Sequence, residues 1–375
     1  MLFHSLEFVF FFPLVVALFF LLPHRFRWVL LLVASYYFYM SWKAEYAVLI
    51  IFSTLIDYFA ARRMERHTEK SKRKKYLILS IVSNIGLLFA FKYFNFFSAE
   101  VRESLAQFNM FYDSPLFEIL LPVGISFYTF QTISYTIDVY RGDRSAEKHL
   151  GYFALYVSFF PQLVAGPIER STRLLPQFFQ EKRFEIGRVV DGIRLMLFGF
   201  FKKLVIADRL AVYVNNVYGA PDEYSALTLL VAVYFFAFQI YCDFSGYSDI
   251  AIGAARVMGY DLMENFRRPY LSRSVSEFWR RWHISLSSWF KDYLYLPLGG
   301  NRVSKSRWSF NIVTVFVICG LWHGANWTFV AFGVLHALYL LFGAWTKGIR
   351  ARLKTNISGY VDSKVGRALQ IVITF

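Results

Sequence analysis

Cysteine is scarce in this sequence. Only two cysteines, Cys242 and Cys319, occur among 375 residues, and both lie in apolar segments. Neither belongs to a CxxC pair or to a His/Cys group with metal-ligand spacing, so the sequence predicts neither a disulfide framework nor a metal site. We expect both thiols to be small hydrophobic core residues, and we expect no bound cofactor.

Charged residues are also few. They make up 18% of the chain, whereas soluble proteins carry about 25%. Hydrophobic residues reach 57%, against about 45–50% in a soluble domain. They come in long blocks rather than amphipathic stripes, which is typical of a helical protein that crosses a membrane several times. The sequence therefore predicts an all-α polytopic membrane protein, folded as one domain over residues 1–375.

Long apolar runs mark the expected membrane segments, because a helix that spans the hydrocarbon core needs about 20 mostly apolar residues. Segment 189–206 is amphipathic and ambiguous. A further apolar run begins at Ala368 and stops at Phe375, as expected of a chain cut where another helix starts. We expect about nine to eleven segments in all. The clearest lie near residues 7–22, 28–42, 45–61, 76–97, 118–139, 150–165, 226–242, 310–322 and 327–345.

Lysine and arginine are absent from the first 23 positions, although a secretory signal would begin with them. We therefore expect residues 7–22 to remain as the first span. Eight basic residues fall instead in Arg62–Lys75, between two apolar blocks. Such loops stay in the cytoplasm near anionic headgroups, which places the N-terminus and loop 98–117 on the opposite side. No nucleic-acid-binding motif accompanies the net charge of +15, so we expect no nucleic-acid partner.

Four densely polar and aromatic stretches interrupt the apolar pattern. The first, Phe159–Ser171, contains Pro161, Gly166 and Pro167. Proline removes a backbone donor, and irregular backbone at membrane depth is tolerated only where protein or a water-filled cavity satisfies it. This stretch is therefore either such an irregular segment or a helix end at the membrane interface.

The second stretch, Tyr241–Gly253, places Asp243, Ser245 and Asp249 directly after an apolar run. We expect a broken helix, or a helix start, that lines a polar cavity. The alternative is that Asp243 and Ser245 only cap a helix containing Ile250–Val257. Both interpretations can hold together.

The third stretch, Ser276–Arg302, reads as one amphipathic helix, lying in the interface or re-entering the membrane, and ending at the turn Pro297–Asn301. His283 lies on its aromatic face, where a histidine is either a packed, hydrogen-bonded residue or a functional one. Arg280, Ser287 and Lys291 form a second face. The aromatic face comprises Trp279, Trp282, His283, Leu286, Phe290 and Tyr293.

The fourth stretch, Gly320–Trp327, places His323 between two tryptophans inside an apolar region. Ionisable residues within a membrane are rare, and they suggest function by default. Gly320 and Gly324 remove side-chain bulk, which lets another backbone or a substrate approach the ring. The alternative is a neutral His323 hydrogen-bonded to a backbone carbonyl or to Asn326.

Together these stretches resemble the membrane-bound O-acyltransferase (MBOAT) family, and most closely its bacterial alginate O-acetylation branch. The similarity extends from near residue 8 to about residue 345. Related proteins usually continue past this C-terminus with more membrane helices, and here the sequence departs from the family pattern. The matching segments are Leu121–Tyr140, Phe159–Pro167, Tyr241–Gly253, Glu277–Arg302 and Gly320–Asn326.

The resemblance implies a ring-like helical bundle, with re-entrant or interfacial helices, whose funnels reach a thin central waist. It implies transfer of an acyl group from a cytoplasmic thioester, acetyl-CoA or a derivative, to a hydroxyl. The invariant membrane histidine of the family falls on His323, and a second position, occupied by His or Asn, falls on His283. It further implies a bacterial inner-membrane location, export of acetyl groups to a polysaccharide such as alginate, and periplasmic transferase or relay proteins as partners.

Acyl transfer from a thioester needs a base, donors for the oxyanion and protection from water. We expect His323 to be the general base, and His283 to orient the acceptor, polarise the carbonyl or shuttle a proton. Candidate oxyanion donors are Trp322, Asn326 and the N–H groups around Gly324. Supporting or tunnel residues are expected to be Trp322, Asn326, Trp282, Asp243, Ser245 and Asp249.

The phosphates of a thioester donor need cations, and Arg280, Arg281 and Lys291 lie on or beside the third stretch. Contact with lipid headgroups is the equally weighted alternative for these three. Asp243 and Asp249 are expected to hold the helices around the tunnel, through hydrogen bonds or ion pairs to the same cations.

Two other classes of protein are left open. A proton-coupled transporter would also bury His and Asp on broken helices, but the sequence has no internal repeat of the transporter kind. A non-catalytic scaffold or conduit of a polysaccharide-modification complex would tolerate the loss of His323.

Overall fold

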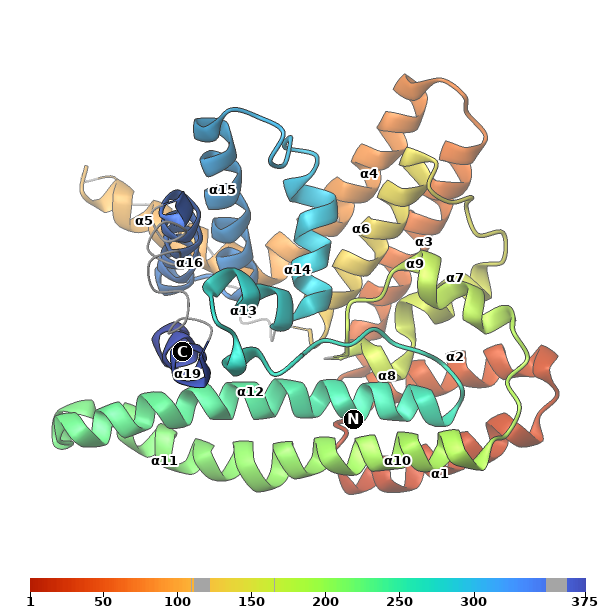
Figure 1. Ribbon diagram of the computed structural model, residues 1–375. Coiled ribbons are helices and arrows are strands. Elements are labelled where there is room, and N and C mark those ends of the chain that lie inside the picture. The colour runs from red at the N-terminus through yellow and green to blue at the C-terminus, as the bar shows by residue number, and fades with distance from the viewer. Residues whose placement is uncertain (109, 111–121, 165, 349–362) are drawn as a thin grey trace. The chain divides into compact units, whose positions relative to one another are not determined.

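The structure is a computed structural model that describes residues 1–108, 110, 122–164, 166–348 and 363–375. These residues form helices joined by turns and loops, with no β-strand among them (Figure 1). The all-α prediction is confirmed. Parts of the expected loop 98–117 and of the expected span 118–139 lie outside the described residues.

The chain divides into two compact units. The first comprises Met1–Ser83 and Val123–Glu264, and the second comprises Asn84–Pro122 and Asn265–Phe375. The single domain that we expected over residues 1–375 stays a prediction, as does the number of membrane segments.

Among the residues that the structure describes, four helical segments are long and apolar enough to cross a membrane, and all four overlap spans that the sequence predicts. They are Ala44–Glu65, Lys70–Ala106, Ala226–Val257 and Trp327–Trp345. The first helix, α1 (Leu6–Leu21), is also apolar but shorter. The prediction of a polytopic membrane protein therefore agrees with the helices.

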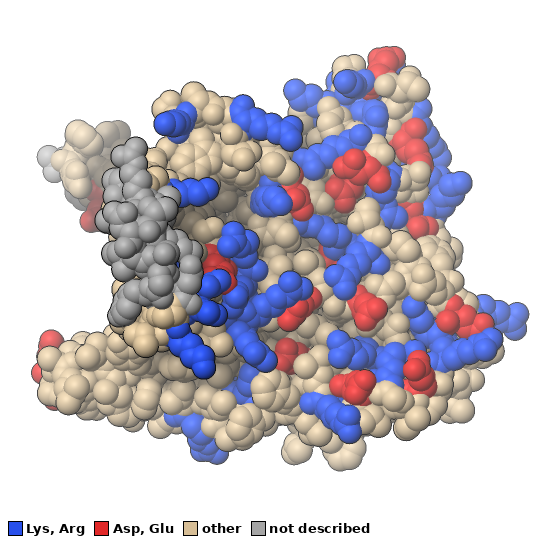
Figure 2. Space-filling view, in the orientation of Figure 1, with Lys and Arg blue, Asp and Glu red and all other residues tan. Residues whose placement is uncertain are grey.

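The first unit holds most of the long helices. Its α4 continues into the second unit, and the basic loop expected in the cytoplasm joins α3 to α4, where blue side chains gather in Figure 2. The helices are α1, α2 (His24–Met40), α3 (Ala47–Glu65), α4 (Lys70–Leu88), α6 (Ile125–Arg141), α7 (Leu150–Ser158), α8 (Phe160–Leu163), α9 (Ser171–Leu174), α10 (Ile186–Phe200), α11 (Asp208–Gly219) and α12 (Ala226–Val257).

Helices α10 and α12 lie side by side, and glycines allow their backbones to touch (Figure 1). A Cβ atom on Gly199 would lie 2.6 Å from the Gly246 carbonyl oxygen, and one on Gly253 would lie 2.6 Å from the Gly192 carbonyl oxygen. The glycines recur every seven residues on both helices, which keeps them on one contact seam. Small residues at such seams are how membrane helices approach closely.

Helix α12 is continuous through the second polar stretch, so the predicted break or helix start at Tyr241–Gly253 is wrong. The alternative, in which Asp243 and Ser245 cap a new helix, is wrong for the same reason. The helix starts instead at Ser225, whose side chain accepts a hydrogen bond from the Thr228 N–H. The polar residues are tolerated inside the helix because lysines pair with them, as shown below.

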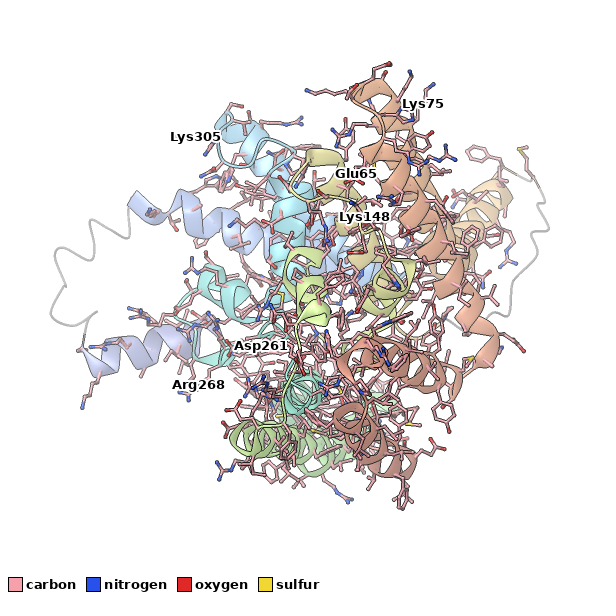
Figure 3. All side chains as sticks on the ribbon, turned by 90° about the vertical axis from the view of Figure 1, so that its right-hand side faces the viewer. Glu65, Lys75, Lys148, Asp261, Arg268 and Lys305 are labelled. Atoms are coloured by element: carbon pink, nitrogen blue, oxygen red, sulfur yellow. The ribbon has the colours of Figure 1, made fainter. Side chains whose placement is uncertain are left out.

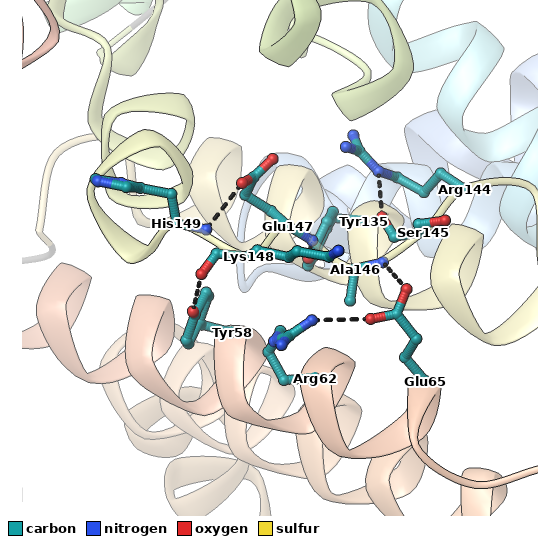
Figure 4. Close-up of polar contacts among 10 residues, drawn as sticks. All are labelled: Tyr58, Arg62, Glu65, Tyr135, Arg144, Ser145, Ala146, Glu147, Lys148 and His149. Carbon is teal, nitrogen blue, oxygen red and sulfur yellow. Dashed lines mark hydrogen bonds and ion pairs between the residues drawn. The ribbon is translucent and has the colours of Figure 1, made fainter. Parts of the chain in front are cut away.

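The loop between α6 and α7 is anchored to α3 (Figures 3 and 4). The Tyr58 hydroxyl donates to the Lys148 carbonyl at 2.6 Å, and the Ala146 N–H donates to Glu65 Oε1 at 3.2 Å. Arg62 holds the other oxygen of Glu65 at 2.9 Å. Three side chains on one face of α3 thereby fix a segment that has no regular structure of its own.

The first polar stretch is irregular, which is one of the two alternatives that the sequence left open. Helix α7 ends at Ser158, α8 has one turn, and residues 167–170 follow without helix. Two side chains there are fully buried. The Gln162 amide donates to Gln131 Oε1 at 2.8 Å, and Glu169 accepts a hydrogen bond from the Met263 N–H. Side chains also satisfy the backbone here, since the Phe160 N–H donates to Ser35 Oγ at 3.0 Å and the Tyr156 hydroxyl donates to the Glu169 carbonyl at 3.2 Å.

The second unit contains α5 (Phe94–Ala106), α13 (Val275–Arg281), α14 (Ile284–Phe290), α15 (Lys305–His323), α16 (Trp327–Trp345) and α19 (Lys364–Thr374). Two π-helical segments, Phe89–Tyr93 and Lys291–Tyr295, extend α4 and α14. The predicted single helix over Ser276–Arg302 is wrong, because the backbone breaks between α13 and α14. His283 has a left-handed conformation there (φ 43°), so the aromatic residues do not form one helical face. The predicted turn at Pro297–Asn301 is confirmed, with Gly299 and Gly300 at positive φ.

Candidate active site

Two histidines flank the indole of Trp322 in the second unit. The centroid of the Trp322 ring lies 4.8 Å from that of His323 and 5.8 Å from that of His283. Both imidazole rings thus lie against the same indole. The structure therefore brings together the two residues that the sequence predicts to be catalytic.

His323 is the last residue of α15, and its side chain is exposed. No hydrogen bond to its ring is formed by the residues the structure describes, and its neighbours are the rings of Trp322, Phe329 and Phe332. The alternative of a histidine buried in a hydrogen bond to Asn326 is therefore not what this geometry shows. Asn326 caps α16 instead, because its Oδ1 accepts from the Thr328 N–H at 2.9 Å.

Glycines set the position of His323 between α15 and α16. A Cβ on Gly320 would lie 2.1 Å from the Phe329 carbonyl oxygen, and one on Gly324 would lie 2.2 Å from the Phe329 ring. Gly320 therefore admits another backbone, which is one of the two possibilities the sequence left open. Because α16 approaches so closely, the turn that carries His323 has little freedom to move.

His283 is buried, and its ring orientation is fixed by Asn265. The Asn265 Oδ1 atom accepts from the Ser285 N–H at 3.2 Å and from the Ser285 hydroxyl at 3.0 Å, so this atom is the amide oxygen. His283 Nδ1 lies 3.2 Å from the same oxygen. That contact is favourable only if Nδ1 carries the proton, which leaves the lone pair of the neutral ring on Nε2.

The end of α15 is held by two residues that the sequence analysis missed. Lys92 donates a hydrogen bond to the Trp322 carbonyl, and the Tyr93 hydroxyl donates to the Leu321 carbonyl at 2.8 Å. Carbonyls in the last turn of a helix have no partner within it, and a cation there is favoured by the helix dipole. The signal was present, since Lys92 is a lone cation within the predicted span 76–97.

A cavity of about 520 Å³ lies among α13, α14 and α15. Two of the three predicted phosphate-binding residues, Arg280 and Lys291, line it, and Arg267 adds a cation that the sequence analysis missed. Arg281 does not line it and instead forms an ion pair with Glu277 at 2.5 Å. Ser287 and Ser288 are further polar lining residues, and the remainder of the wall is mostly apolar.

Trp282 and the two histidines do not line this cavity. Trp282 stacks between Phe266, Tyr270 and Phe278, with centroid separations of 5.0 to 6.0 Å. It therefore packs the turn that precedes His283. Its expected place in a tunnel wall stays a prediction.

Asp243, Ser245 and Asp249 belong to the first unit, where lysines bind them. Lys202 lies 2.6 Å from Asp249 and 3.0 Å from the Ser245 hydroxyl, and Lys203 lies 2.6 Å from Asp243 and 2.7 Å from Asp208. The expected pairing with Arg280, Arg281 or Lys291 is thus replaced by pairing with lysines of the amphipathic segment 189–206. The π-helix Phe201–Ala207 directs two consecutive lysines toward α12, as π-bulges often do at sites under constraint.

The described residues contain no group of three or more His, Cys, Asp or Glu side chains that could hold a metal ion. The arrangement is instead that of a membrane protein with an exposed imidazole, a buried imidazole of fixed tautomer, and a nearby cavity carrying cations. This set of groups suits proton transfer at a site that binds an anionic, partly apolar molecule.

Comparison with known sequences identifies the family. Residues 145–360 match the sequence model of the MBOAT, membrane-bound O-acyltransferase family, and the chain belongs to that family. The prediction made from the four polar stretches is therefore confirmed.

Three curated relatives illustrate the range of the family around this chain. It is 42% identical to the probable alginate O-acetylase AlgI of Pseudomonas aeruginosa over 91% of this chain and 65% of the relative. It is 35% identical to the peptidoglycan O-acetyltransferase of Helicobacter pylori, over 83% and 63%. It is 30% identical to the teichoic acid D-alanyltransferase of Streptococcus thermophilus, over 68% and 65%. The chain thus spans about two thirds of the length of these relatives.

Proposed function

We propose that this chain is an O-acyltransferase that moves an acetyl group from a thioester on the cytoplasmic side toward hydroxyls of an exported polysaccharide. The observation that carries the proposal is the exposed His323 imidazole, held at the end of α15 beside Trp322 and the buried His283. Membership of the family supports the reaction class, and the names of the relatives support acetyl or another acyl group as the cargo.

In the proposed step, a ring nitrogen of His323 removes the proton from the acceptor hydroxyl as its oxygen attacks the thioester carbonyl. The tetrahedral oxyanion then collapses, the carbon–sulfur bond breaks, and the departing thiolate takes the proton from the imidazolium. General-base catalysis of this kind contributes typically about 10²–10⁴-fold. The Trp322 indole N–H and backbone N–H groups near Gly324 are the proposed oxyanion donors.

His283 is proposed to orient the acceptor. Its Nε2 lone pair, fixed by the contact between Nδ1 and Asn265, can accept a hydrogen bond from a hydroxyl. The attacking hydroxyl has a single proton, which must point at His323, so the hydroxyl held by His283 is a neighbouring one on the same acceptor sugar. His283 would thus fix the position of the sugar, while His323 acts as base on the hydroxyl that reacts.

The thioester donor is proposed to bind at the cavity among α13, α14 and α15. Arg267, Arg280 and Lys291 supply positive charge for phosphates, and the apolar wall suits the linear arm that carries the thioester. Acetyl-CoA is the simplest donor with this chemistry. The alternative role for these cations is contact with lipid headgroups. Replacing each of them by a neutral residue and measuring donor binding separates the two roles, because only donor contact predicts weaker binding of acetyl-CoA.

The acceptor is proposed to be a polysaccharide outside the inner membrane, such as alginate. The relatives' names specify alginate, peptidoglycan and teichoic acid, which share hydroxyls on a polymer of the cell surface. We further propose that periplasmic transferase or relay proteins complete the transfer. The N-terminus would face the periplasm, and loop 62–75 the cytoplasm, as the basic residues predict.

The test is acetyl transfer in cells that carry His323→Ala. The measurement is acetyl ester on the exported polysaccharide, with membrane level checked by immunoblot. His67→Ala is the matched control, because His67 only stacks on Tyr76 in the basic loop. We expect His323→Ala to lower acetylation at least about 100-fold at normal protein level, as loss of a general base requires. Persistent acetylation in His323→Ala would instead assign the chain a scaffold or conduit role.

A further inference from the structure

A second cavity lies in the first unit, and none of the residues proposed for acyl transfer lines it. It is a groove of about 660 Å³ between α1 and α10, within the size range of small-molecule sites, about 300–1,000 Å³. Every side chain that lines it is apolar, including Ala17, Phe20, Phe184, Ile193 and Leu197. Several of these side chains are exposed, so the groove opens at the surface.

The groove forms because its two walls pack on other partners. Helix α1 packs against α2, whereas α10 is held to α12 by the glycine seam. The lining runs from Phe12 to Leu21 on α1 and from Val189 to Phe200 on α10. At about 1.5 Å per residue these stretches are about 14 and 17 Å long. Half of a hydrocarbon core of about 30 Å, one leaflet, has this length.

One end of the groove is basic. Residues 23–27 and 180–188, which adjoin Leu21 and Phe184, contain five basic residues against two acidic ones. Arg25 and Arg183 are exposed, and Lys182 is partly exposed. In Figure 2, blue lysine and arginine side chains lie where α10 begins, whereas the surface along α10 and α12 is mostly tan and uncharged.

Arg27 fixes the geometry of this end. It is 9% exposed, and its guanidinium donates to the Leu22 carbonyl at 3.0 Å and to the Lys182 carbonyl. It also lies 4.8 Å from the centroid of the Phe19 ring. The loop after α1 and the loop before α10 are therefore tied together, which keeps Arg25, Lys182 and Arg183 close to the mouth of the groove.

We infer that this groove is a binding site for one acyl chain of an anionic phospholipid, whose phosphate is held by Arg25, Lys182 and Arg183. The apolar wall matches one acyl chain over the depth of one leaflet, and the charge at its end matches an anionic headgroup. Loop 23–27 follows the first span of a chain whose N-terminus is predicted to lie opposite the cytoplasm, so this loop falls on the cytoplasmic side and the lipid belongs to the inner leaflet. The inference is independent of the proposed acyl transfer.

The test uses the purified full chain in detergent, with bound lipids counted by native mass spectrometry. Phosphatidylglycerol and phosphatidylcholine with identical acyl chains are the two probes. We expect the wild type to prefer phosphatidylglycerol. The variants Arg25→Gln, Lys182→Gln and Arg183→Gln each remove one cation, and each should reduce that preference about fivefold. The matched charge control is Lys72→Gln, Lys74→Gln and Lys75→Gln, which removes three cations from the start of α4.

A second pair of variants tests the groove itself. Ala17→Trp fills the groove, whereas Leu14→Trp adds the same ring to an exposed position of α1 that does not line it. We expect Ala17→Trp to abolish retention of one phosphatidylglycerol molecule and Leu14→Trp to leave it unchanged, with equal helix content by circular dichroism. Equal binding of both lipids by the wild type, or equal retention by the two tryptophan variants, overturns the inference. If the wild type is a dimer, and Ala17→Trp dissociates it without changing lipid retention, the groove binds a second copy of this chain and the inference is wrong.

Discussion

Removal of the Asn265 side chain should damage both stability and the acyl-transfer site. In Asn265→Ala, the Ser285 N–H, the Ser285 hydroxyl and the His283 Nδ1–H lose the oxygen that accepts them at 3.0 to 3.2 Å. Each buried donor left without a partner costs about 1–3 kcal/mol. Because the Ser285 hydroxyl can rotate to another acceptor, we expect a loss of about 2–4 kcal/mol in the free energy of unfolding.

The same change should lower acetylation through His283. The hydrogen bond to Asn265 favours the Nδ1–H tautomer by about 1 kcal/mol, which corresponds to about fivefold. Loss of ring orientation adds to this, so we expect acetyl ester per membrane-bound protein to fall about tenfold or more. This expectation rests on the orienting role proposed for His283.

Two further variants separate the effect of the His283 tautomer on activity from a general loss of stability. Asn265→Asp keeps an acceptor oxygen in the same place, so it should retain more activity than Asn265→Ala. Ser285→Ala removes one donor but leaves the contact between Asn265 and His283, so it should mainly reduce thermal stability. Thermal unfolding in detergent and acetyl ester in cells are the two measurements. The reasoning fails if Asn265→Ala acetylates at the wild-type level, or if Asn265→Asp is as inactive as Asn265→Ala.

Three other changes test separate parts of the structure. Gly253→Leu would push the α12 side chain into the α10 backbone, so it should lower the thermal unfolding temperature in detergent, with a cost of about 1–3 kcal/mol or more. Lys92→Met removes the donor to the Trp322 carbonyl, so acetylation should fall about tenfold at normal membrane level, because a hydrogen bond to a charged group contributes about 1.5–3 kcal/mol. Burial raises the pKa of Glu169 to about 7, despite opposition from the Met263 N–H, Arg173 and Arg170. The folded state therefore binds this proton more tightly than the unfolded state, so stability should fall as pH rises from about 4.5 to 7 and then level off. Glu169→Gln should remove that pH dependence.

Each of these predictions has its own control. Gly187→Leu adds the same side chain where nothing lies within 4 Å, and it should be neutral. If both glycine variants behave alike, backbone contact is not what the seam provides. Lys92→Arg keeps a cation and should retain part of the activity, whereas equal loss in both variants would argue against a capping role. A wild type and a Glu169→Gln variant with parallel stability profiles between pH 4.5 and 7 would show that Glu169 does not titrate there.

The helices and the two histidines were predictable from the sequence because each leaves a strong local signal. Apolar runs of about 20 residues indicate helices, since a single segment of that length satisfies its own polar groups in lipid only as a helix, and barrel strands are about half as long. His323 was evident as an ionisable residue in such a run. His283 was evident as a candidate, but not its left-handed backbone, because no glycine or proline marks the break between α13 and α14.

The partners of polar groups were harder to predict, because they depend on tertiary contacts. Asp243 and Asp249 suggested a broken helix only while their charges had no known partner, and Lys202 and Lys203 lie about forty residues earlier in the chain. Asn265 precedes His283 by 18 residues, in a segment with no periodicity. Lys92 is different, since the rule that drew attention to His323 applies to it equally.

The left-handed backbone at His283 limits which residues can occupy that position. Gly adopts this conformation most readily and Asn, Asp and His are enriched in it, whereas other residues pay about 1–2 kcal/mol and β-branched residues fit worst. Saturation mutagenesis at this position should therefore recover Asn and Gly among the well-folded variants, and should lose Val and Ile irrespective of chemistry. The resemblance implies His or Asn at this position. Main-chain geometry therefore limits the residue types that fit here to a few, and function selects the side chain among them.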